Sequence, residues 1–318
     1  MEVEDSNCTF DGGLPFQTLN LISFIPLFIF GITCNVLALW IFCCKMQKWT
    51  VTTLFMMNLI VADILIVSTI PFRLYAFLRR SNLEDALCKA IASIFFMNMY
   101  MSIFTITAIA FDRYLAIRHP LRYKSWISLR KASITCCIFW VICIVVCVVQ
   151  NLAIRDDTFK RCFQKNNTRP INFSMVLVVV GFLLPLLAIS FCSGKVIMTL
   201  RVKTTMDTCK PGSVKKAVRI VIAGLVSFVI CFLPVHVGYT IRFVAETFEA
   251  PCYIHVRITG FIHVANVIAN SNCVLDSMVY YFAASEIWDH VYTSRERTIL
   301  SAGSHKRTKD CPGSCSHS

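Results

Sequence analysis

AIASIFFMNMYMSIFTITAIAFDRYLA, residues 90–116, is a long apolar run that ends on the triplet Asp112-Arg113-Tyr114. A charged pair at the edge of such a run is costly where a membrane begins, so it indicates more than anchoring. Two further acids, Asp63 and Asp276, lie inside other apolar runs. Ionisable residues within membrane spans are rare and mostly mark functional sites. The stretch therefore predicts a membrane helix bundle with a functional site rather than a simple membrane anchor.

The composition of the whole chain is that of a membrane protein. Its 318 residues are 56% hydrophobic and only 15% charged, whereas a soluble domain carries about 25% charged residues. A spanning helix needs about 20 mostly apolar residues, and seven segments are long enough. Because the connections are short, we predict an all-α membrane protein with a seven-transmembrane helix bundle. The predicted spans are residues 18–44, 51–78, 87–117, 132–152, 172–200, 217–245 and 255–282.

The distribution of charge predicts the orientation of the bundle. The first, third and fifth connections are rich in Lys and Arg, and Asp207 is their one acid. The positive-inside rule places these connections in the cytoplasm and the N-terminus outside. Since the basic residues flank membrane spans, the net charge of +13 argues against a nucleic-acid partner. We divide the chain into an extracellular N-terminus (1–16), a seven-transmembrane domain (17–282), a short amphipathic cytoplasmic helix (283–295) and a disordered C-terminal tail (296–318).

Several features of the predicted outer side suit an oxidising compartment. Three glycosylation acceptors fall there, at Asn7, Asn166 and Asn172. Of the 17 cysteines, four also fall there: Cys8, Cys88, Cys162 and Cys252. An even number of extracellular cysteines predicts two disulfide bridges, and four cysteines allow three pairings.

Polar residues inside the spans predict a cation site. Two unpaired acids within a bilayer need a counter-charge, and a hard cation with oxygen ligands supplies one. The alternative is a purely structural network, because polar residues in spans often bond to a neighbouring helix. The set comprises Asn35, Asp63, Ser102, Asn272 and Asp276.

Cationic residues in the outer halves of the spans predict an anion site if they converge. Arginine grips carboxylates and phosphates with a planar fork of donors. The alternative is that each side chain reaches the interface alone as an anchor. The set comprises Arg73, His236, Arg242 and His263.

The chain lacks the common signals of catalysis. It has no phosphate-cradling Gly loop, no His-Glu-x-x-His zinc helix and no Gly-x-Ser-x-Gly elbow, so we do not expect an enzyme. Leu121 is instead an apolar residue in a basic predicted cytoplasmic loop, which suits a protein partner. Pro234 lies inside the sixth span, where a missing backbone bond can bend the helix or let it pivot.

These motifs together resemble the rhodopsin-like (class A) G protein-coupled receptors over about residues 15–295. The extra cysteine pair, Cys8 and Cys252, is similar to that of the purinoceptor-like branch. The motifs that carry the resemblance are Asn35, Asn58-Leu59 with Asp63, Cys88, Asp112-Arg113-Tyr114, Trp140, Pro185, Phe228 with Cys231-Phe232-Leu233-Pro234, and Asp276 with Tyr280.

The resemblance implies a receptor that binds its ligand outside and activates heterotrimeric G proteins inside. Asp112, Arg113 and Tyr114 match the triplet that couples to the G protein, and Leu121 lies in the adjoining loop. The resemblance also implies arrestin and a receptor kinase as partners of the Ser/Thr-containing tail. The residues that match the family's sodium pocket are Asp63, Ser102, Asn272 and Asp276, so the expected cofactor is at most an allosteric Na⁺. The implied disulfides are Cys88–Cys162 and Cys8–Cys252.

Single positions refine the expected ligand. Arg73 matches an anion-binding arginine of leukotriene- and nucleotide-like receptors, and Arg242 matches a ligand-binding arginine of a close relative. Phe95 stands where amine receptors carry Asp, which argues against an amine. Met99 stands where that close relative is expected to have an arginine, and Val214 replaces an acid that often locks the Arg of the third span.

We therefore expect a plasma-membrane receptor for a small anionic ligand, such as an acidic metabolite, a lysophospholipid or a nucleotide-like molecule. Membrane lipids surround it. The alternative is a transporter that uses the Asp63–Asp276 pair as an ion relay, although no internal repeat is visible. The expected ligand contacts are Arg73, Phe95, Met99, Tyr100, His236, Arg242 and His263.

Overall fold

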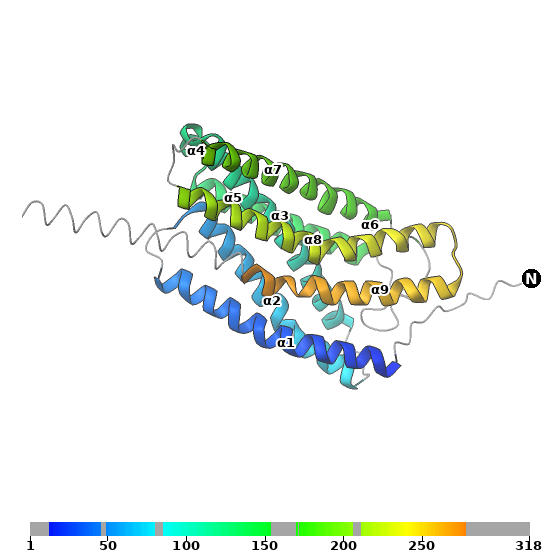
Figure 1. Cartoon of the computed structure of the whole chain (residues 1–318). Coiled ribbons are helices and arrows are strands. Elements are labelled where there is room, and N and C mark those ends of the chain that lie inside the picture. Colours follow the sequence, from blue (N-terminus) through cyan, green and yellow to red (C-terminus); the bar gives the residue numbers. More distant parts are fainter. Residues whose placement is uncertain are drawn as a thin grey trace, which may run out of the picture.

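Seven long helices run side by side, alternately up and down, in one bundle (Figure 1). The computed structural model describes residues 13–45, 49–79, 85–153, 170, 172–205 and 211–277. In this part of the chain, seven helices are long and apolar enough to cross a membrane. The predicted all-α, seven-span fold is confirmed. The predicted amphipathic helix at 283–295 and the tail at 296–318 lie outside the described residues.

The helices have the following bounds. The first span is α1 (Gly13–Trp40), which continues as the π-helical turn η1 (Ile41–Lys45). The second and third are α2 (Val51–Arg79) and α3 (Asp85–Arg118), and the fourth is α5 (Leu129–Ala153). The fifth combines α6 (Asn172–Val176), η3 (Leu177–Leu183) and α7 (Leu184–Thr205). The sixth is α8 (Pro211–Thr247), and the seventh contains α9 (Cys252–Asn270) within a span that reaches Ser277.

One short helix was not predicted from the sequence. It is α4 (Pro120–Trp126), between the third and fourth spans. Pro120 occupies its first turn, where the missing N–H costs nothing and the fixed φ favours a helix. The amide of Tyr123 bonds back to the carbonyl of His119 at 2.9 Å. As a result, α4 leaves Leu121 93% exposed and turns Tyr123 toward α3.

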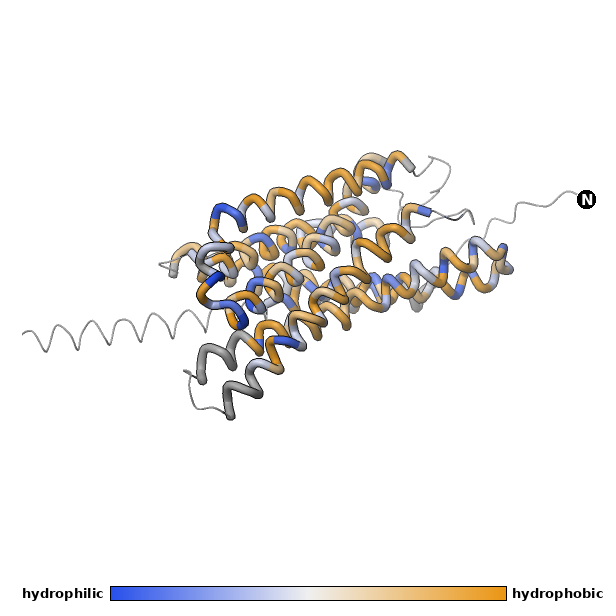
Figure 2. The backbone as a smooth tube through the Cα atoms, turned by 90° about the horizontal axis from the view of Figure 1, so that it is seen from above, coloured by the Kyte–Doolittle hydropathy of each residue, from blue (hydrophilic) through white to orange (hydrophobic). Residues whose placement is uncertain are grey.

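The third span is the central helix of the bundle. It packs against α2, α5, α7, α8 and α9, so its side chains meet those of most other spans. Isoleucines, methionines and aromatic residues along α3 are fully buried in the common core. By contrast, α5 exposes one apolar stripe that includes Ile138, Val141 and Val145. Hydrophobic residues cover most of the length of the helices (Figure 2), as a lipid-facing bundle requires.

Helices α8 and α9 pack closely because Gly238 has no side chain. A Cβ at this position would lie 2.8 Å from Ile262 Cγ1, which is too close for ordinary contact. Pro234, one turn earlier, lies inside α8 and removes one backbone hydrogen bond. The sixth span therefore packs closely against the seventh, one turn after the position where the backbone hydrogen bonding of the sixth span is interrupted.

Candidate functional site

Five buried polar side chains gather halfway along the bundle, and we call them the mid-span cluster. They are Asp63, Asn98, Ser102, Asn272 and Asp276. The amide of Asn98 donates to Asp63 Oδ1 at 3.1 Å, and that of Asn272 donates to Asp276 Oδ2 at 2.8 Å. The two carboxylates are close enough to interact electrostatically.

The mid-span cluster fits a hard cation. Asp276 Oδ1 and Ser102 Oγ are buried and have no hydrogen-bond partner in the described part of the chain. Two neighbouring carboxylates with an unsatisfied hydroxyl form an oxygen-rich group of the kind that such cations prefer. Sequence reasoning missed Asn98, although a polar residue in an apolar run was a signal for it. Asn35 bonds instead to the backbone of Cys273 at 2.9 Å and ties α1 to the seventh span.

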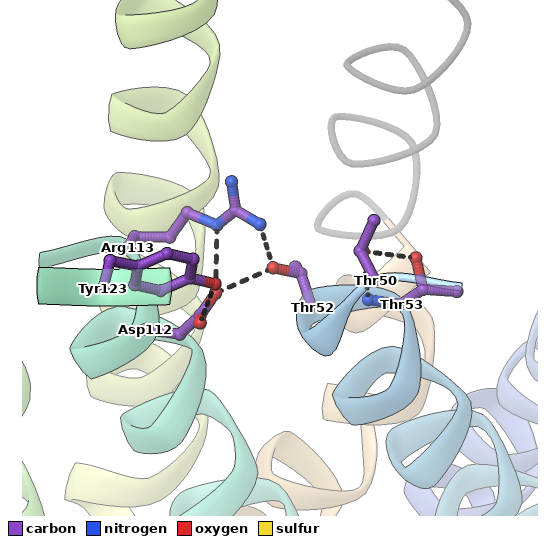
Figure 3. A network of polar contacts seen from close by, with 6 residues as sticks. All are labelled: Thr50, Thr52, Thr53, Asp112, Arg113 and Tyr123. Atoms are coloured by element: carbon purple, nitrogen blue, oxygen red, sulfur yellow. Dashed lines mark hydrogen bonds and ion pairs between the residues drawn. The ribbon is translucent and has the colours of Figure 1, made fainter. Parts of the chain in front are cut away.

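A second group surrounds the Asp112-Arg113 pair, and Figure 3 shows it closely. The Thr52 hydroxyl donates to Asp112 Oδ2 at 2.9 Å, and the Tyr123 hydroxyl donates to Asp112 Oδ1 at 2.8 Å. Arg113 donates from its guanidinium to the Thr52 hydroxyl and lies 3.6 Å from Asp112 Oδ2 through Nε. We call these four residues the Asp112 network, and they join α2, α3 and α4.

The rest of the predicted coupling surface borders the Asp112 network. Tyr114 packs edge-on against His119 at 6.2 Å and against Phe191 at 5.9 Å. Leu121 is strongly exposed, and its contact with a protein partner stays a prediction. Val214 lies in α8, but its side chain is outside the described residues.

Toward the opposite end of the bundle, Arg73 is buried among aromatic rings. Its guanidinium carbon lies 5.3 Å from the centre of the Phe95 ring and 6.0 Å from that of Phe24. It also donates to Asn270 Oδ1 at 3.3 Å, across to the seventh span. A cation held over ring faces is attracted to their electron-rich surface. The side chain therefore points into the bundle and does not extend to the interface.

His236 lies deeper, and its ring is fixed on two sides. Nδ1 lies 2.7 Å from the carbonyl of Phe232, which can only accept, so Nδ1 carries the hydrogen. The ring stacks on Phe182 at 4.2 Å, and Tyr100 meets it edge-on at 6.0 Å. Nε2 is buried and has no hydrogen-bond partner among the described residues.

Tyr239 connects the predicted cations, although sequence reasoning did not select it. It interacts electrostatically with both Arg73 and Arg242, and Arg242 does the same with His263. Its ring stacks on Phe96 at 6.3 Å and contacts His236 at 6.3 Å. We call Arg73, Tyr239, Arg242 and His263 the Tyr239 cluster. Electrostatic interactions thus relate Arg73, Arg242 and His263, and His236 contacts the Tyr239 ring.

Arg242 has a carboxylate partner that the sequence reasoning also overlooked. Its Nε donates to Glu246 Oε1 at 2.9 Å, and the Glu246 carboxylate is nearly fully buried. The spacing of four residues on one helix was the signal. The remaining predicted ligand contacts lie buried on α3 in the core below: Phe95, Met99 and Tyr100.

The predicted modifications are described only in part. Cys88 and Cys252 are both disulfide-bonded, and their expected partners Cys162 and Cys8 lie outside the described residues. The acceptors Asn7 and Asn166 lie outside as well. Asn172 is the exposed first residue of α6.

Comparison with known proteins now decides the family. The model of the seven-transmembrane receptors of the rhodopsin family matches residues 34–280. The chain belongs to this family. Its relatives include the human (Homo sapiens) G-protein coupled receptor 35, which is 39% identical over 281 residues, or 88% of this chain and 87% of the relative. The chicken (Gallus gallus) lysophosphatidic acid receptor 6 is 32% identical over 291 residues, covering 88% and 94% respectively.

A more distant relative belongs to the purinoceptors. This purinoceptor of Xenopus laevis is 29% identical over 289 residues, which cover 87% of this chain and 53% of the relative. Family membership makes the chain a multi-pass membrane receptor for small molecules that couples to G proteins. It is not an enzyme, and the alternative of a transporter does not hold.

Proposed function

We propose that this receptor lies in the plasma membrane and responds to a small anionic ligand, such as an acidic metabolite, a lysophospholipid or a nucleotide-like molecule. The Tyr239 cluster then faces the outside, with the N-terminus, and the Asp112 network faces the cytoplasm. The positive-inside rule supports this orientation, since the connections near Asp112 carry most of the Lys and Arg residues. The observation that carries the ligand proposal is that Arg73 is buried over the Phe95 and Phe24 rings and donates to Asn270. Tyr239 interacts electrostatically with both Arg73 and Arg242.

Both arginines are suited to bind an anion. A guanidinium stays protonated at physiological pH and can hold a carboxylate or phosphate with two hydrogen bonds. Arg73 lies over aromatic rings and donates to the neutral Asn270 through Nη1, and its guanidinium carries five N–H donors that could also bind a ligand anion. Arg242 uses Nε for Glu246, which leaves its two Nη groups able to serve a second anion. One relative is named a lysophosphatidic acid receptor, and this acidic lipid agrees with an anionic ligand.

The ligand would lie across the third and sixth spans. Its acid group would meet Arg73 and Arg242, with the Tyr239 hydroxyl as a further donor and His263 beside Arg242. Its apolar part would pack on the side chains that α3 buries: Phe95, Phe96, Met99 and Tyr100.

Ring contacts lead from this position down α8. His236 stacks on Phe182, Phe182 on Phe228 at 5.5 Å, and Phe228 meets Phe232 edge-on at 5.7 Å. Pro234 lies between His236 and Phe232, where α8 lacks one backbone bond. A ligand that displaces the Tyr239 and His236 rings would therefore favour an outward swing of α8 around Pro234.

The mid-span cluster would shift the equilibrium between the resting and the active receptor. Asp63, Asp276, Ser102 and Asn272 would hold a sodium ion, whose charge would compensate two neighbouring buried carboxylates. These residues would favour the resting receptor if they bind the ion in that state alone. Arrestin and a receptor kinase are proposed as partners of the tail at 296–318.

The proposal is tested by a G-protein activation screen on the full-length receptor. The library holds acidic metabolites, nucleotides and lysophospholipids, each beside a neutral or cationic compound of similar size. We expect the active compounds to be anions, and we expect Arg73→Ala and Arg242→Ala to weaken them.

Arg257→Ala is the matched control, because Arg257 is an exposed arginine of the same outer half in α9. The potency of an agonist on Arg257→Ala should equal its potency on the wild-type receptor. A best agonist that is neutral or cationic, or equal losses in all three variants, would contradict the anion site.

A further inference from the structure

We propose that Cys43 and Cys44 form an S-acylation site, at which the receptor carries long-chain fatty acyl groups as thioesters. The two cysteines are adjacent at the end of the first span, which runs from Thr18 to Cys44. Both are exposed free thiols. The site rests on the orientation that the proposed function gives to the receptor, and it does not depend on the ligand or on the anion site.

Exposure sets this pair of cysteines apart. Cysteine is among the residue types that folded proteins bury most often, and there it packs as a small hydrophobe. Phe42, the neighbour of Cys43, is only 1% exposed and packs in the core, so this turn directs its two thiols out of the bundle. Packing therefore gives no reason for the pair. The free cysteines that are buried in the described spans are Cys136, Cys143, Cys147, Cys192, Cys231 and Cys273.

The pair lies at the membrane boundary, on the predicted cytoplasmic side. Lys45 follows directly and Lys48 comes three residues later, and these charges end the apolar run. The next helix, α2, begins at Val51, and its second residue Thr52 bonds to Asp112, so the pair lies at the same end of the bundle as α4 (Figure 1). Thiols stay reduced in the cytoplasm, and lysines are attracted to the anionic lipids of the cytoplasmic leaflet. Cysteines beside the membrane on this side are typical acceptors of S-acyl groups.

The surface of α1 gives an acyl chain a place to lie. Residues three, four or seven positions apart share one face of a helix. From Ile29 to Cys43 the helix rises about 20 Å, at about 1.5 Å per residue. An acyl chain on the pair can therefore extend into the lipid along this face while its thioester stays at the boundary. The exposed apolar residues that form the face are Ile29, Val36, Leu37 and Trp40.

The reaction is an acyl transfer from a fatty acyl thioester of coenzyme A, catalysed by a membrane-bound acyltransferase of the cell. The cysteine Sγ loses its proton and attacks the carbonyl carbon of the donor, because the thiolate is the nucleophile. A C–S bond to the receptor forms, the C–S bond of the donor breaks, and coenzyme A leaves as a thiol that takes up a proton. Nothing is oxidised or reduced. Hydrolysis of the new thioester returns the free cysteine and a fatty acid, so the modification is reversible.

The experiment detects thioesters on the full-length receptor expressed in mammalian cells. Free thiols are blocked, thioesters are cleaved with neutral hydroxylamine, and each released thiol is tagged with a polyethylene glycol maleimide that retards the receptor on a gel. The wild-type receptor should show a shift that depends on hydroxylamine. The double variant Cys43→Ala, Cys44→Ala should lose this shift, and the corresponding double serine variant should lose it as well.

Cys137→Ala is the matched control. Cys137 is also an exposed free cysteine of the described residues, but it lies in α5 about 9 Å along the helix from Lys131, at about 1.5 Å per residue. Its thiol therefore lies within the apolar span and away from the boundary, and Cys137→Ala should keep the wild-type shift.

A second control leaves the pair untouched. It replaces by alanine the other cysteines of the predicted cytoplasmic side, and it should keep the full shift. This variant decides the question even if replacement of Cys43 and Cys44 impairs folding. The cysteines that it removes are Cys209, Cys311 and Cys315.

Three results would overturn the proposal: no hydroxylamine-dependent shift in the wild-type receptor, a shift that survives in both double variants, or loss of the shift when only Cys209, Cys311 and Cys315 are replaced. A loss in Cys137→Ala as large as in the double variants would do so too. An epitope at the N-terminus, stained on intact cells, tests the orientation separately. A wrong orientation of the receptor is thereby distinguished from an unmodified site.

Discussion

The two ends of the bundle use charge in opposite ways. In the Asp112 network, the carboxylate accepts from the Thr52 and Tyr123 hydroxyls, and Arg113 donates to Thr52, so that α2, α3 and α4 are joined. Around Tyr239, Arg73 lies over aromatic rings, Arg242 is paired with Glu246, and both arginines interact electrostatically with the phenol. The first end centres on one carboxylate that accepts two hydroxyls, whereas the second holds two arginines and one carboxylate in an apolar surrounding.

This difference shows how each end can work. If the hydrogen bonds on Asp112 restrain the resting receptor, removal of a hydroxyl should raise its basal activity. Under the proposed function, the arginines near Tyr239 bind the ligand, so removal of one of them should weaken the response to ligand. Variants at the two ends should therefore move basal and ligand-stimulated activity separately.

The largest expected effect is at Arg73. Charge-assisted hydrogen bonds contribute roughly 1.5–3 kcal/mol each, so Arg73→Ala should lower agonist potency by about 10- to 150-fold. Arg73→Lys keeps the charge without the fork and should recover only part of this loss. Dose–response curves at matched surface expression decide the matter. Unchanged agonist potency in Arg73→Ala, or full recovery of potency in Arg73→Lys, would show that ligand binding does not need the forked guanidinium of Arg73.

Sodium should oppose agonist binding through the mid-span cluster. Allosteric coupling is typically about 5- to 150-fold, and agonist affinity should fall by at least about fivefold when NaCl replaces KCl at constant ionic strength. Asp63→Asn removes one of the two carboxylates and should abolish the difference between the salts. Equal affinities in both salts for the wild-type receptor would show that the cluster is a structural network only.

Tyr239→Phe sharpens the comparison at the ligand end. The ring can keep its stacking on Phe96, and only the hydroxyl, which interacts electrostatically with both arginines, is lost. A neutral hydrogen bond contributes about 0.5–1.5 kcal/mol, so potency should fall by about 2- to 12-fold with basal activity unchanged. A rise in basal activity would mean that Tyr239 restrains α8 and does not bind the ligand.

Tyr123→Phe should have the smallest effect, and at the other end. It removes one of the two hydroxyls on Asp112 but leaves Arg113 held by Thr52. We expect basal G-protein nucleotide exchange to rise about two- to fivefold, with agonist affinity almost unchanged. Basal exchange at the wild-type level would show that the Tyr123 hydroxyl does not restrain the resting receptor.

Sequence patterns predicted the spans well because apolar length is a local property. Helix ends differ modestly; the fourth span, for example, begins at Leu129 and not at residue 132. The mid-span acids and the outer cations were also visible, since each interrupts an apolar run. Their convergence was not, because it depends on how each helix is rotated and packed.

The residues that sequence reasoning missed are ordinary ones in special places. Thr52, Asn98 and Tyr239 are common residue types in spans. Only packing shows that Thr52 and Asn98 bond to carboxylates and that Tyr239 interacts electrostatically with two arginines. Tyr123 required the short helix α4, which Pro120 could have indicated. Glu246 was the exception, since its spacing from Arg242 on one helix already predicted a pair.

The most direct test of the anion site compares one agonist acid with its own neutral amide. Both compounds are titrated in a G-protein activation assay on the wild-type receptor and on Arg73→Ala, with Arg257→Ala as the control. The account predicts that the acid is the more potent by about 10-fold or more on the wild type and on Arg257→Ala, and that this advantage largely disappears in Arg73→Ala. An amide as potent as the acid on the wild-type receptor, or an advantage that survives in Arg73→Ala, would contradict it.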